Sequence, residues 1–593
     1  MDPLGEYSGR LADRRATRER LNHVDARVGY ARLVVFLAGL ALAVFAARGT
    51  LSWWLVVPPT AAFVALVVYH DRVLRRAAAA GRAIVFYERG IARIEDRWIG
   101  AGEAGDRFRD DAHLYANDLD LFGRGSLFQL LSTARTRAGE ARLAAWLMQP
   151  ASRDEVRDRQ QAVGELTPSL DLRESLSLAG VEVAAAVHDE TLVAWAEGDP
   201  IVPATLRVVP VFLTLATLAS IAWYAAVRDA VPLEISIVTQ SLFAWTYRHH
   251  VERALHAADG PARDLDVLSH VLAQLEQQQF ASPRLAAVRR RLDTTGRAAS
   301  ASIRALHRLV AMHDWEHNLA FTPVALVLLW GTHLAWAIEA WRSRHGAEIR
   351  RWLDAVADVE ALASLASYRY EHPADPFPEL LDTDEATFDG AALGHPLLPA
   401  ARMVRNDVRL DGAARVLVIS GSNMSGKSTL LRTVGINAVL ALAGAPVRAA
   451  ALRLSPLAIG ATLRIQDSLQ EGRSRFYAEI TRIRELSDRA RLSPPLLFLL
   501  DELFHGTNSH DRVVGAGGVL RGLIDRGAIG LITTHDLALT TIADHLAPRA
   551  VNVHFEDWFE GGELQFDYRM KPGPVTRSNA LALMKAVGLD VEG

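Results

Sequence analysis

The sequence of 593 residues contains no cysteine. This absence excludes disulfide bridges, thiolate metal sites and cysteine nucleophiles, and it fits a reducing compartment without proving one. No charge of one sign dominates, because 65 Lys and Arg residues face 69 Asp and Glu residues and leave a net charge of -4. That balance excludes a global attraction to nucleic acid, although a local basic face is still compatible with it.

The sequence also lacks low-complexity tracts and a cleavable secretory signal. The segment before Tyr30 is polar and rich in arginine over too great a length for such a signal. A chain of this size exceeds one hydrophobic core, so roughly two to four domains are expected.

Four apolar stretches, arranged in two pairs, stand out. The first pair covers residues 30–47 and 51–69, and the second covers residues 208–227 and 231–247, where prolines and Glu234 weaken the pattern. Each stretch is close to the roughly 20 residues with which a helix crosses the hydrocarbon of a bilayer. The connectors are too short to hold a domain. We therefore predict two transmembrane helical hairpins.

The distribution of arginine predicts how these hairpins are oriented. Only Arg48 and Arg228 lie in the tight turns, whereas the outer ends carry Arg14, Arg15, Arg18, Arg20, Arg27, Arg72, Arg75, Arg76, Arg248 and Arg253. By the positive-inside rule, both hairpins would cross outward and return. This predicts a multi-pass protein of the cytoplasmic (inner) membrane, with its bulk and its C-terminal domain in the cytoplasm. The alternative is two buried hairpins in a large soluble core.

A helical region is expected around the hairpins. Residues 1–82 comprise the basic N-terminal segment and the first hairpin. Residues 254–312 and 342–370 show leucine, valine and isoleucine at helical spacing, and we predict an all-α core or lever domain over residues 83–390 that the second hairpin interrupts. A fifth apolar run, residues 319–338, would place the C-terminal part across the membrane if it were a crossing. We therefore predict a buried core helix there.

After a proline-rich segment at residues 372–385, predicted to be a linker, short β-rich runs alternate with helical ones. This pattern predicts an α/β domain with a parallel sheet over residues 391–593.

The segment RVLVISGSNMSGKSTLLRTVG runs from a strand through Gly-x-x-x-x-Gly-Lys-Ser into a helix, which is typical of a P-loop that wraps phosphates with backbone amides. The predicted nucleotide-binding residues are Gly421, Ser422, Asn423, Met424, Ser425, Gly426, Lys427, Ser428 and Thr429.

These residue types predict ATP hydrolysis with Mg²⁺. Lys427 is expected to reach the outer phosphates and Ser428 to ligate magnesium. Two further apolar runs end in polar groups: PPLLFLLDE ends in Asp501 and Glu502, and AIGLITTHD leads into His535. Asp501 is predicted to hold the magnesium shell and Glu502 to activate the attacking water. His535 is a candidate γ-phosphate sensor, although a lone histidine is more often structural.

Five motifs in order resemble those of the MutS mismatch-repair ATPases. GSNMSGKST resembles the family's G-P-N-M-G-G-K-S-T, and EGRSRFYAEI is similar to its G-R-S-T-F-M-x-E-M. DELFHGTNSHD resembles D-E-L-G-R-G-T-S-T-x-D, TTHD resembles the switch histidine, and FDYRMKPGPVTRSNALALMKAVGL resembles the C-terminal tail. Residues 125–166 are similar to the start of the family's helical core, so the likeness covers roughly residues 120–593 outside the second hairpin.

The resemblance implies a homodimer with composite sites. It implies that Ser474 reaches the neighbouring subunit's nucleotide, and that the signature residues Asn508, Ser509 and Asp511 lie at the dimer interface. It also implies that Asn423 bonds near the phosphates or the attacking water, and that Val404, with Met403, packs against the base.

Several departures from the family weigh against mismatch recognition. The segment before residue 120 is too short for the family's recognition and connector domains, and the DNA-gripping clamp is replaced by the apolar hairpin near residues 205–250. Phe504 and His505 replace Gly-Arg, and Arg512 replaces Gly. The sequence therefore predicts a membrane-anchored MutS-family ATPase with DNA as an open partner. The alternatives are a soluble paralogue that binds branched or damaged DNA, a mechanical membrane ATPase, and, less favoured, an ABC transporter.

Overall fold

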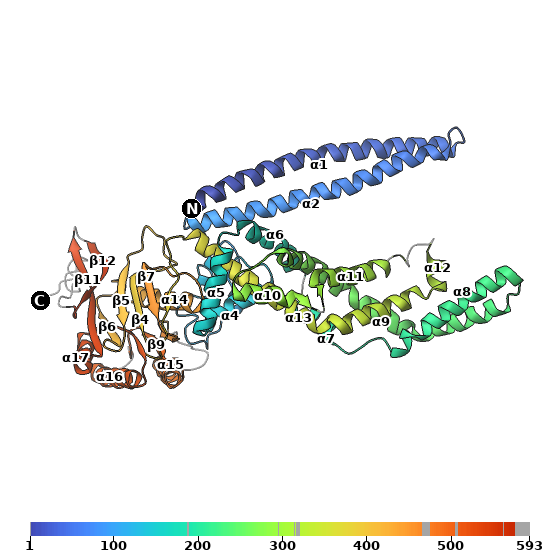
Figure 1. Ribbon diagram of the computed structural model, residues 1–593. Helices are drawn as coiled ribbons and strands as arrows, with labels where there is room; N and C mark the ends of the chain where they lie inside the picture. The colour runs from blue at the N-terminus through green and yellow to red at the C-terminus, as the bar shows by residue number, and fades with distance from the viewer. Residues whose placement is uncertain are drawn as a thin grey trace.

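A computed structural model shows a helical region followed by two β-sheets with flanking helices. The sheets lie at one end of an elongated molecule, and two helical hairpins reach toward the opposite end (Figure 1). The described residues are 2–186, 189–294, 296–313, 315, 321–464, 475–504, 508–560 and 563–575.

The first hairpin consists of α1 (Pro3–Ala47) and α2 (Val57–Ile94), joined through the short helix η1 (Trp53–Val56). Its outer part carries exposed apolar side chains, such as Tyr30 at 74% and Trp54 at 81% exposure. Its inner end is anchored to the helical body: Tyr7 Oη donates to Glu371 at 3.2 Å, and Arg93 Nε donates to the same carboxylate at 2.6 Å. The hairpin is thus packed at its base and apolar on its outside.

The second hairpin consists of α8 (Val209–Val227) and the first part of α9 (Val231–Gln277). Phe212 and Trp245 are 67% and 63% exposed, whereas the polar Thr217 and Gln240 are buried between the helices. Thr217 Oγ1 donates to Gln240 Oε1 at 2.5 Å. Because these polar side chains lie between the two helices, the outer surface of the second hairpin is apolar, like that of the first.

Three of the described helical segments are long and apolar enough to cross a membrane, judged by length and composition. They are α1, residues Trp53–Ile94 and α8. The fourth predicted stretch, residues 231–247, forms the start of α9 and is not among these three; it contains Glu234 and Gln240, which lower its apolar character.

The prediction of one buried core helix over residues 319–338 is wrong in its first half. Among the described residues of this run, α12 (Thr322–Val327) has Leu326 68% exposed, and the backbone breaks at Leu329 with φ 47°. Gln240 Nε2 donates to the carbonyls of Leu326 at 2.7 Å and Val327 at 2.9 Å, which lie at the C-terminal end of α12, where helical carbonyls lack their usual partners. The second half is buried as predicted, at the start of α13 (Trp330–Glu371).

The helical body is organised around α13, whose Trp352 is fully buried. Side-chain caps begin three of its described helices: Ser126 accepts from the Gln129 amide, Thr136 from the Gly139 amide and Ser152 from the Glu155 amide. The remaining helices are α3 (Leu127–Leu131), α4 (Arg137–Met148), α5 (Arg153–Leu166), α6 (Leu170–Ala186), α7 (Asp189–Glu197), α10 (Pro283–Leu292) and α11 (Ala299–His313), with the short helices η2 (Asp106–Phe108) and η3 (Ala204–Arg207) and a small ribbon of β1 (Asp293–Thr294) and β2 (Arg297–Ala298).

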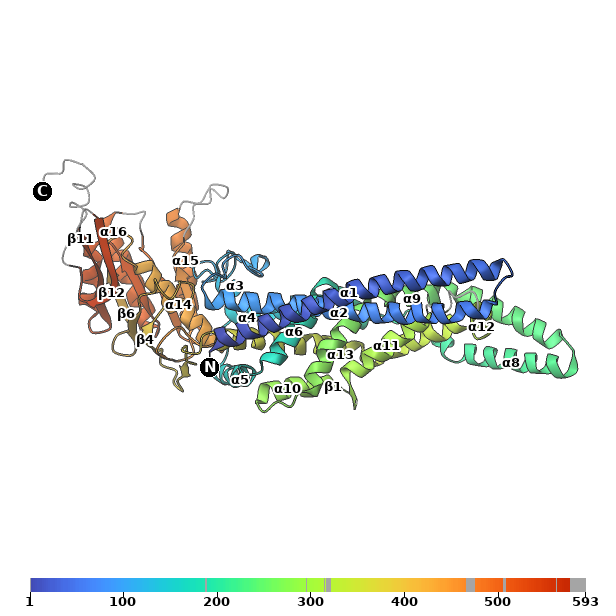
Figure 2. The same ribbon diagram turned by 90° about the horizontal axis from the view of Figure 1, so that it is seen from above.

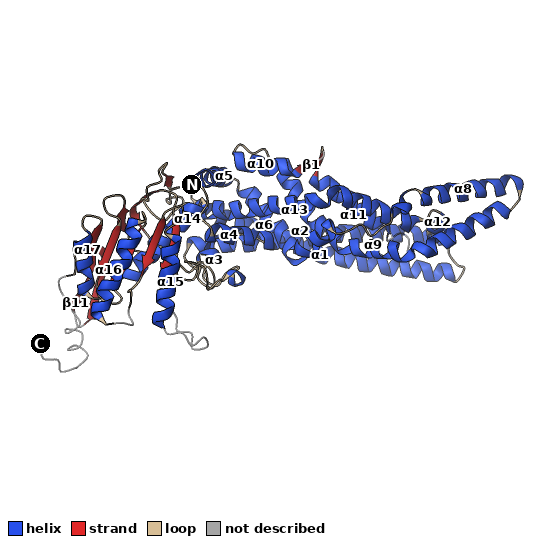
Figure 3. Cartoon of the chain, turned by 90° about the horizontal axis from the view of Figure 1, so that it is seen from below, coloured by secondary structure: helices blue, strands red, loops and turns tan. Residues whose placement is uncertain are grey.

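Two sheets form the C-terminal part, seen as red strands at one end of Figure 3. The larger has the order β12-β11-β6-β10-β9-β8, in which five strands run parallel and β12 pairs antiparallel with β11. Its strands are β6 (Val416–Ser420), β8 (Ala458–Thr462), β9 (Leu496–Leu500), β10 (Ile529–Thr534), β11 (Ala550–Glu560) and β12 (Glu563–Pro572). The parallel sheet predicted from the sequence therefore holds for five of these six strands.

The smaller sheet is mixed, with the order β3-β7-β4-β5. It contains β3 (Glu379–Leu380), β4 (Phe388–Leu393), β5 (Asn406–Leu410) and β7 (Ala451–Leu454), and so begins upstream of residue 391 and within the predicted linker. The helices of this part are α14 (Lys427–Ala443), α15 (Arg475–Arg489), α16 (Ser509–Asp525) and α17 (Thr541–Leu546), with η5 (Leu537–Thr540).

Candidate active site

Three of the predicted polar segments leave the same edge of the larger sheet. β10 pairs in parallel with β6, Thr534 opposite Ser420, and with β9, Ile532 opposite Leu500. Because parallel strands end on a common edge, the loops that follow β6, β9 and β10 meet there, as ligand sites of parallel α/β sheets do.

The loop after β6 has the backbone of a phosphate-binding turn. Gly426 has φ 102° immediately before α14, and a Cβ there would come within 3.1 Å of the Tyr568 ring. Lys427 is buried, and its Nζ donates to the carbonyls of Gly421 at 2.8 Å and Ser422 at 2.7 Å. Burial lowers the pKa of Lys427, while the nearby Glu502, Asp501 and Asp557 oppose that shift. The ammonium is thus held at the loop with acidic groups nearby.

The polar atoms of this loop suit a phosphate ligand. Ser422 Oγ and Ser425 Oγ are buried and lack a hydrogen-bond partner within the described part of the chain. Buried hydroxyls normally have partners, so two orphaned ones in a P-loop are consistent with a bound anion. Within the described ranges, no group of three or more His, Asp or Glu is placed to hold a metal. Mg²⁺ binds through one or two protein oxygens together with nucleotide phosphates, and Ser428 and Asp501 are residues that could supply such oxygens.

The acidic pair after β9 is held by the two neighbouring strands. The Asp501 amide donates to the Thr462 carbonyl at 3.1 Å, and the Asp501 carboxylate accepts from Thr533 Oγ1. The Glu502 amide donates to the same Thr533 Oγ1 at 3.1 Å, and Glu502 has φ 50°. Its carboxylate lies 3.5 Å from His535 Nδ1. Thr533, to which the sequence pattern assigns no role, thus binds both members of the acidic pair, the Asp501 carboxylate and the Glu502 amide.

A pocket of about 680 Å³ opens beside the loop. Of the predicted residues, Asn423, Met424, Gly426, Lys427, Ser428, Thr429, Val404 and Glu502 line it. Gly421, Ser422, Ser425, Asp501 and His535 are not among its lining residues. Met403 is not either; its side chain packs against Gly394 instead.

The pocket also contains residues to which the sequence analysis assigned no role. They are Leu393, His395, Leu398, Arg402, Asn406, Leu430, Thr433, Phe555 and Tyr568. Tyr568 comes from β12, and its main-chain carbonyl accepts from Asn406 Nδ2 at 3.0 Å. Burial, and secondarily Arg432, lowers the pKa of His395 to about 4, so this imidazole is neutral near pH 7. The tail motif FDYRM was the available signal for Tyr568.

The signature residues lie apart from the pocket, on the surface at the start of α16. Asn508 caps this helix by accepting from the Asp511 amide at 2.9 Å, and both residues are exposed. Arg512, which replaces a glycine of the MutS pattern, donates to the Phe504 carbonyl at 3.1 Å and lies 3.6 Å from Asp536. Ser474, His505 and the side chain of Ser509 lie outside the described residues.

Comparison with known proteins agrees with this geometry. Residues 417–592 match the family model for MutS domain V. The C-terminal part of the chain is thus similar to MutS domain V. A protein named endonuclease MutS2, from Thermus thermophilus, is 34% identical over 206 residues, 33% of this chain and 26% of the relative. A protein named DNA mismatch repair protein MutS 2, from Halobacterium salinarum, is 34% identical over 239 residues, 40% of this chain and 27% of the relative.

These matches agree with the resemblance seen in the motifs. The chain spans only about a quarter of the length of these curated relatives. The α1–α2 and α8–α9 hairpins lie outside the residues that match MutS domain V.

Tyr568 offers a test of the pocket as a nucleotide site. Tyr568→Ala should raise the Kd of a non-hydrolysable ATP analogue about tenfold, since stacking of an aromatic ring on a base contributes about 1–3 kcal/mol. Isothermal titration calorimetry measures this directly. Tyr477→Ala, at an exposed tyrosine of α15 that does not line the pocket, is the matched control and should bind normally. Equal affinities in the two variants would contradict the assignment.

Proposed function

We propose that this protein is a membrane-anchored ATPase of the MutS family that binds and hydrolyses ATP with Mg²⁺. The observation that carries the proposal is the convergence of the Lys427 loop and Glu502 on one pocket, with Asp501 and His535 alongside, in a domain that matches MutS domain V.

Each residue has a distinct part in the proposed reaction. The amides at the start of α14 and the Lys427 ammonium bind and neutralise the outer phosphates. Glu502 orients the attacking water and accepts its proton, while His535, 3.5 Å away, holds the Glu502 carboxylate in place. Mg²⁺, when bound with ATP, stabilises the charge that develops on the phosphate oxygens, and Ser428 and Asp501 are the residues that would hold it.

Two substitutions separate binding from turnover. Lys427→Ala should abolish tight ATP binding, because it removes the positive charge that faces the phosphates. Glu502→Gln should bind ATP but lose turnover by about a hundredfold or more, because an amide cannot accept the proton. Steady-state phosphate release and analogue binding by the purified full-length chain provide the measurements. A rate near wild type in either variant would overturn the active-site assignment.

We further propose a homodimer with composite sites. The exposed Asn508 and Asp511 at the start of α16 are available for contact with a second copy, as the MutS resemblance implies. In this proposal Ser474 completes the neighbouring subunit's site.

A mixing experiment tests the composite sites. Ser474→Ala and Lys427→Ala should each be inactive alone, because each removes one half of every site. Their hybrid should recover one working site, since one subunit keeps its own Lys427 and receives the partner's Ser474. Phosphate release is measured after subunit exchange has been shown by affinity pull-down. Activity equal to the sum of the two inactive homodimers would argue against action in trans.

The membrane anchor is supported by the position and surface of the hairpins. Both point away from the sheets toward the same end of the molecule in two perpendicular views (Figures 1 and 2). Most of the large apolar side chains that are exposed lie between residues 30 and 69 or between residues 208 and 245. A contiguous apolar surface of this size would be an aggregation liability in water.

The inner part of the first hairpin has a different surface. α1 contains 45 residues, which correspond to about 68 Å, more than the roughly 30 Å of a hydrocarbon core. Its inner half carries arginines, and one of them, Arg14, pairs with Glu174 of the helical body at 2.9 Å. We therefore propose that the outer half of the first hairpin and the second hairpin are immersed, in the cytoplasmic membrane, with the ATP site in the cytoplasm.

Cysteine labelling on this cysteine-free background tests the orientation. Single cysteines at Gly49 and Asp229, in the two turns, should react with a membrane-impermeant maleimide added outside intact cells, because the turns would lie beyond the bilayer. Cysteines at Arg76 and Arg253 should react only after permeabilisation, as should one at Ser578, which lies outside the described residues.

Labelling of Asp229 from the cytoplasmic side alone would make the second hairpin a modified soluble clamp. DNA binding, which the name of the Halobacterium relative suggests, would then become the leading function, and its affinity should fall steeply with salt. Cytoplasmic labelling of Gly49 as well would overturn the membrane proposal.

A further inference from the structure

We propose that residues 110–121, here called the strap, hold the ATP site in its working geometry, and that Asp118 is the positioning residue within it. The proposal rests on the ATPase function proposed above and adds a route by which the helical part of the protein regulates that site. The strap lies outside the residues that match MutS domain V.

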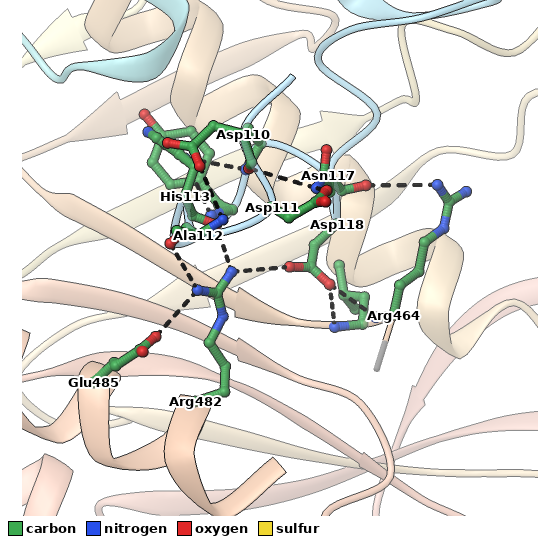
Figure 4. Close-up of polar contacts among 12 residues, drawn as sticks. Asp110, Asp111, Ala112, His113, Asn117, Asp118, Arg464, Arg482 and Glu485 are labelled. Carbon is green, nitrogen blue, oxygen red and sulfur yellow. Dashed lines mark hydrogen bonds and ion pairs between the residues drawn. The ribbon is translucent and has the colours of Figure 1, made fainter. Parts of the chain in front are cut away.

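The strap first continues the hydrogen bonding of strand β8. Asp118 is 4% exposed, and its Oδ1 accepts from the amides of Leu463 at 2.7 Å and Arg464 at 2.8 Å (Figure 4). The Leu114 carbonyl accepts from the Ala461 amide at 2.8 Å. Thr462, which lies between Ala461 and Leu463, accepts through its carbonyl from the Asp501 amide. Asp118 therefore secures the strand end on which the predicted magnesium carboxylate rests.

The strap also lies against α14, the helix that Lys427 begins. Arg432 Nε donates to the Asp118 carbonyl at 3.2 Å. A Cβ at Gly435 would come within 2.6 Å of Leu119 Cδ2, so strap and helix approach each other closely at this glycine. One short segment thus contacts both the P-loop helix and the strand beside the acidic pair.

Two arginines bind the strap from the domain side. Arg482 of α15 donates to the Ala112 carbonyl at 3.1 Å and lies 3.8 Å from Asp118 Oδ2, and Arg464 makes two bonds to Asp120 at 2.6 and 3.1 Å. Burial raises the pKa of Asp118, whereas the two amides and the arginines counteract it. A buried carboxylate with this many partners is costly to disrupt, because its removal leaves several polar groups unpaired.

The opposite side of the strap is attached to the helical body. Tyr115 Oη donates to the Leu147 carbonyl at 3.1 Å, and His113 Nε2 lies 3.1 Å from the Met148 carbonyl oxygen, both at the end of α4. Along the chain, residues 95–109 connect the strap to α2 of the first hairpin. A displacement of the hairpin base or of α4 would therefore reach β8 and α14 through the strap. Hydrolysis, which depends on the position of Asp501 and Glu502, would respond more than ATP binding.

Asp118→Ala in the purified full-length chain tests this inference. It should lower kcat about tenfold or more and also lower the Tm, because buried polar groups lose a partner, while the Kd of a non-hydrolysable ATP analogue stays close to wild type. Asp118→Asn, which keeps an oxygen to accept from the amides, should recover part of the rate. Asp111→Ala is the matched control: its carboxylate is exposed and accepts from Asn117 within the strap, so kcat should be unchanged.

The outcomes separate this inference from the ATPase proposal. If wild type hydrolyses ATP and Glu502→Gln does not, the ATPase proposal stands. A wild-type kcat in Asp118→Ala, or a loss of kcat and analogue binding together, would then overturn the positioning role alone. If Asp118→Ala does not fold, the same comparison is made with Asp118→Asn, for which a reduced kcat with normal analogue binding is expected and a wild-type kcat contradicts the inference.

Discussion

The parallel alignment of strands β8, β9, β10 and β6 is the constraint on which the candidate site depends. Hydrogen bonding in register brings the ends of four strands, far apart in sequence, to one edge. The loop before Lys427, the pair Asp501 and Glu502, and His535 are therefore neighbours because of the sheet and not because of their own attraction. Thr533 completes this arrangement, since one hydroxyl binds both the Asp501 carboxylate and the Glu502 amide.

The distribution of polar contacts and apolar surface changes along the length of the molecule. At the base of the first hairpin, Arg93 and Tyr7 converge on the buried Glu371 of α13, and such a bonded cluster ties the hairpin firmly to the body. Toward the hairpin tips the pattern reverses, with polar groups such as Gln240 turned inward and tryptophans outward. This distribution supports the proposed membrane anchor, with water around the sheets and hydrocarbon around the hairpin tips. The strap lies between these regions, and it gives the proposed anchor a physical connection to the proposed ATP site.

Much of the C-terminal domain could be predicted because its signals are local. A glycine-rich turn between an apolar strand and a helix is encoded by residues that are adjacent in the chain. The P-loop could therefore be predicted from the sequence alone, as could the strand ends at Asp501 and His535. Long apolar stretches with short turns similarly predicted the helical hairpins that the structure contains. The structure of the fifth apolar run, residues 319–338, was harder to predict. The exposure of Leu326 depends on a backbone break at Leu329 and on Gln240, which is more than eighty residues away in the chain.

The sequence by itself determined the chemical groups of the site, the parallel character of its central strands and the hairpins, since each follows from residue type and local spacing. Only the tertiary structure decided which groups share the pocket. It brought Tyr568, His395 and Asn406 to the P-loop from distant segments and assigned Asp118 to the end of β8. Contacts of this kind join residues that are far apart in the chain, and no periodicity or spacing encodes which partner a buried carboxylate or ring will meet when the layers pack.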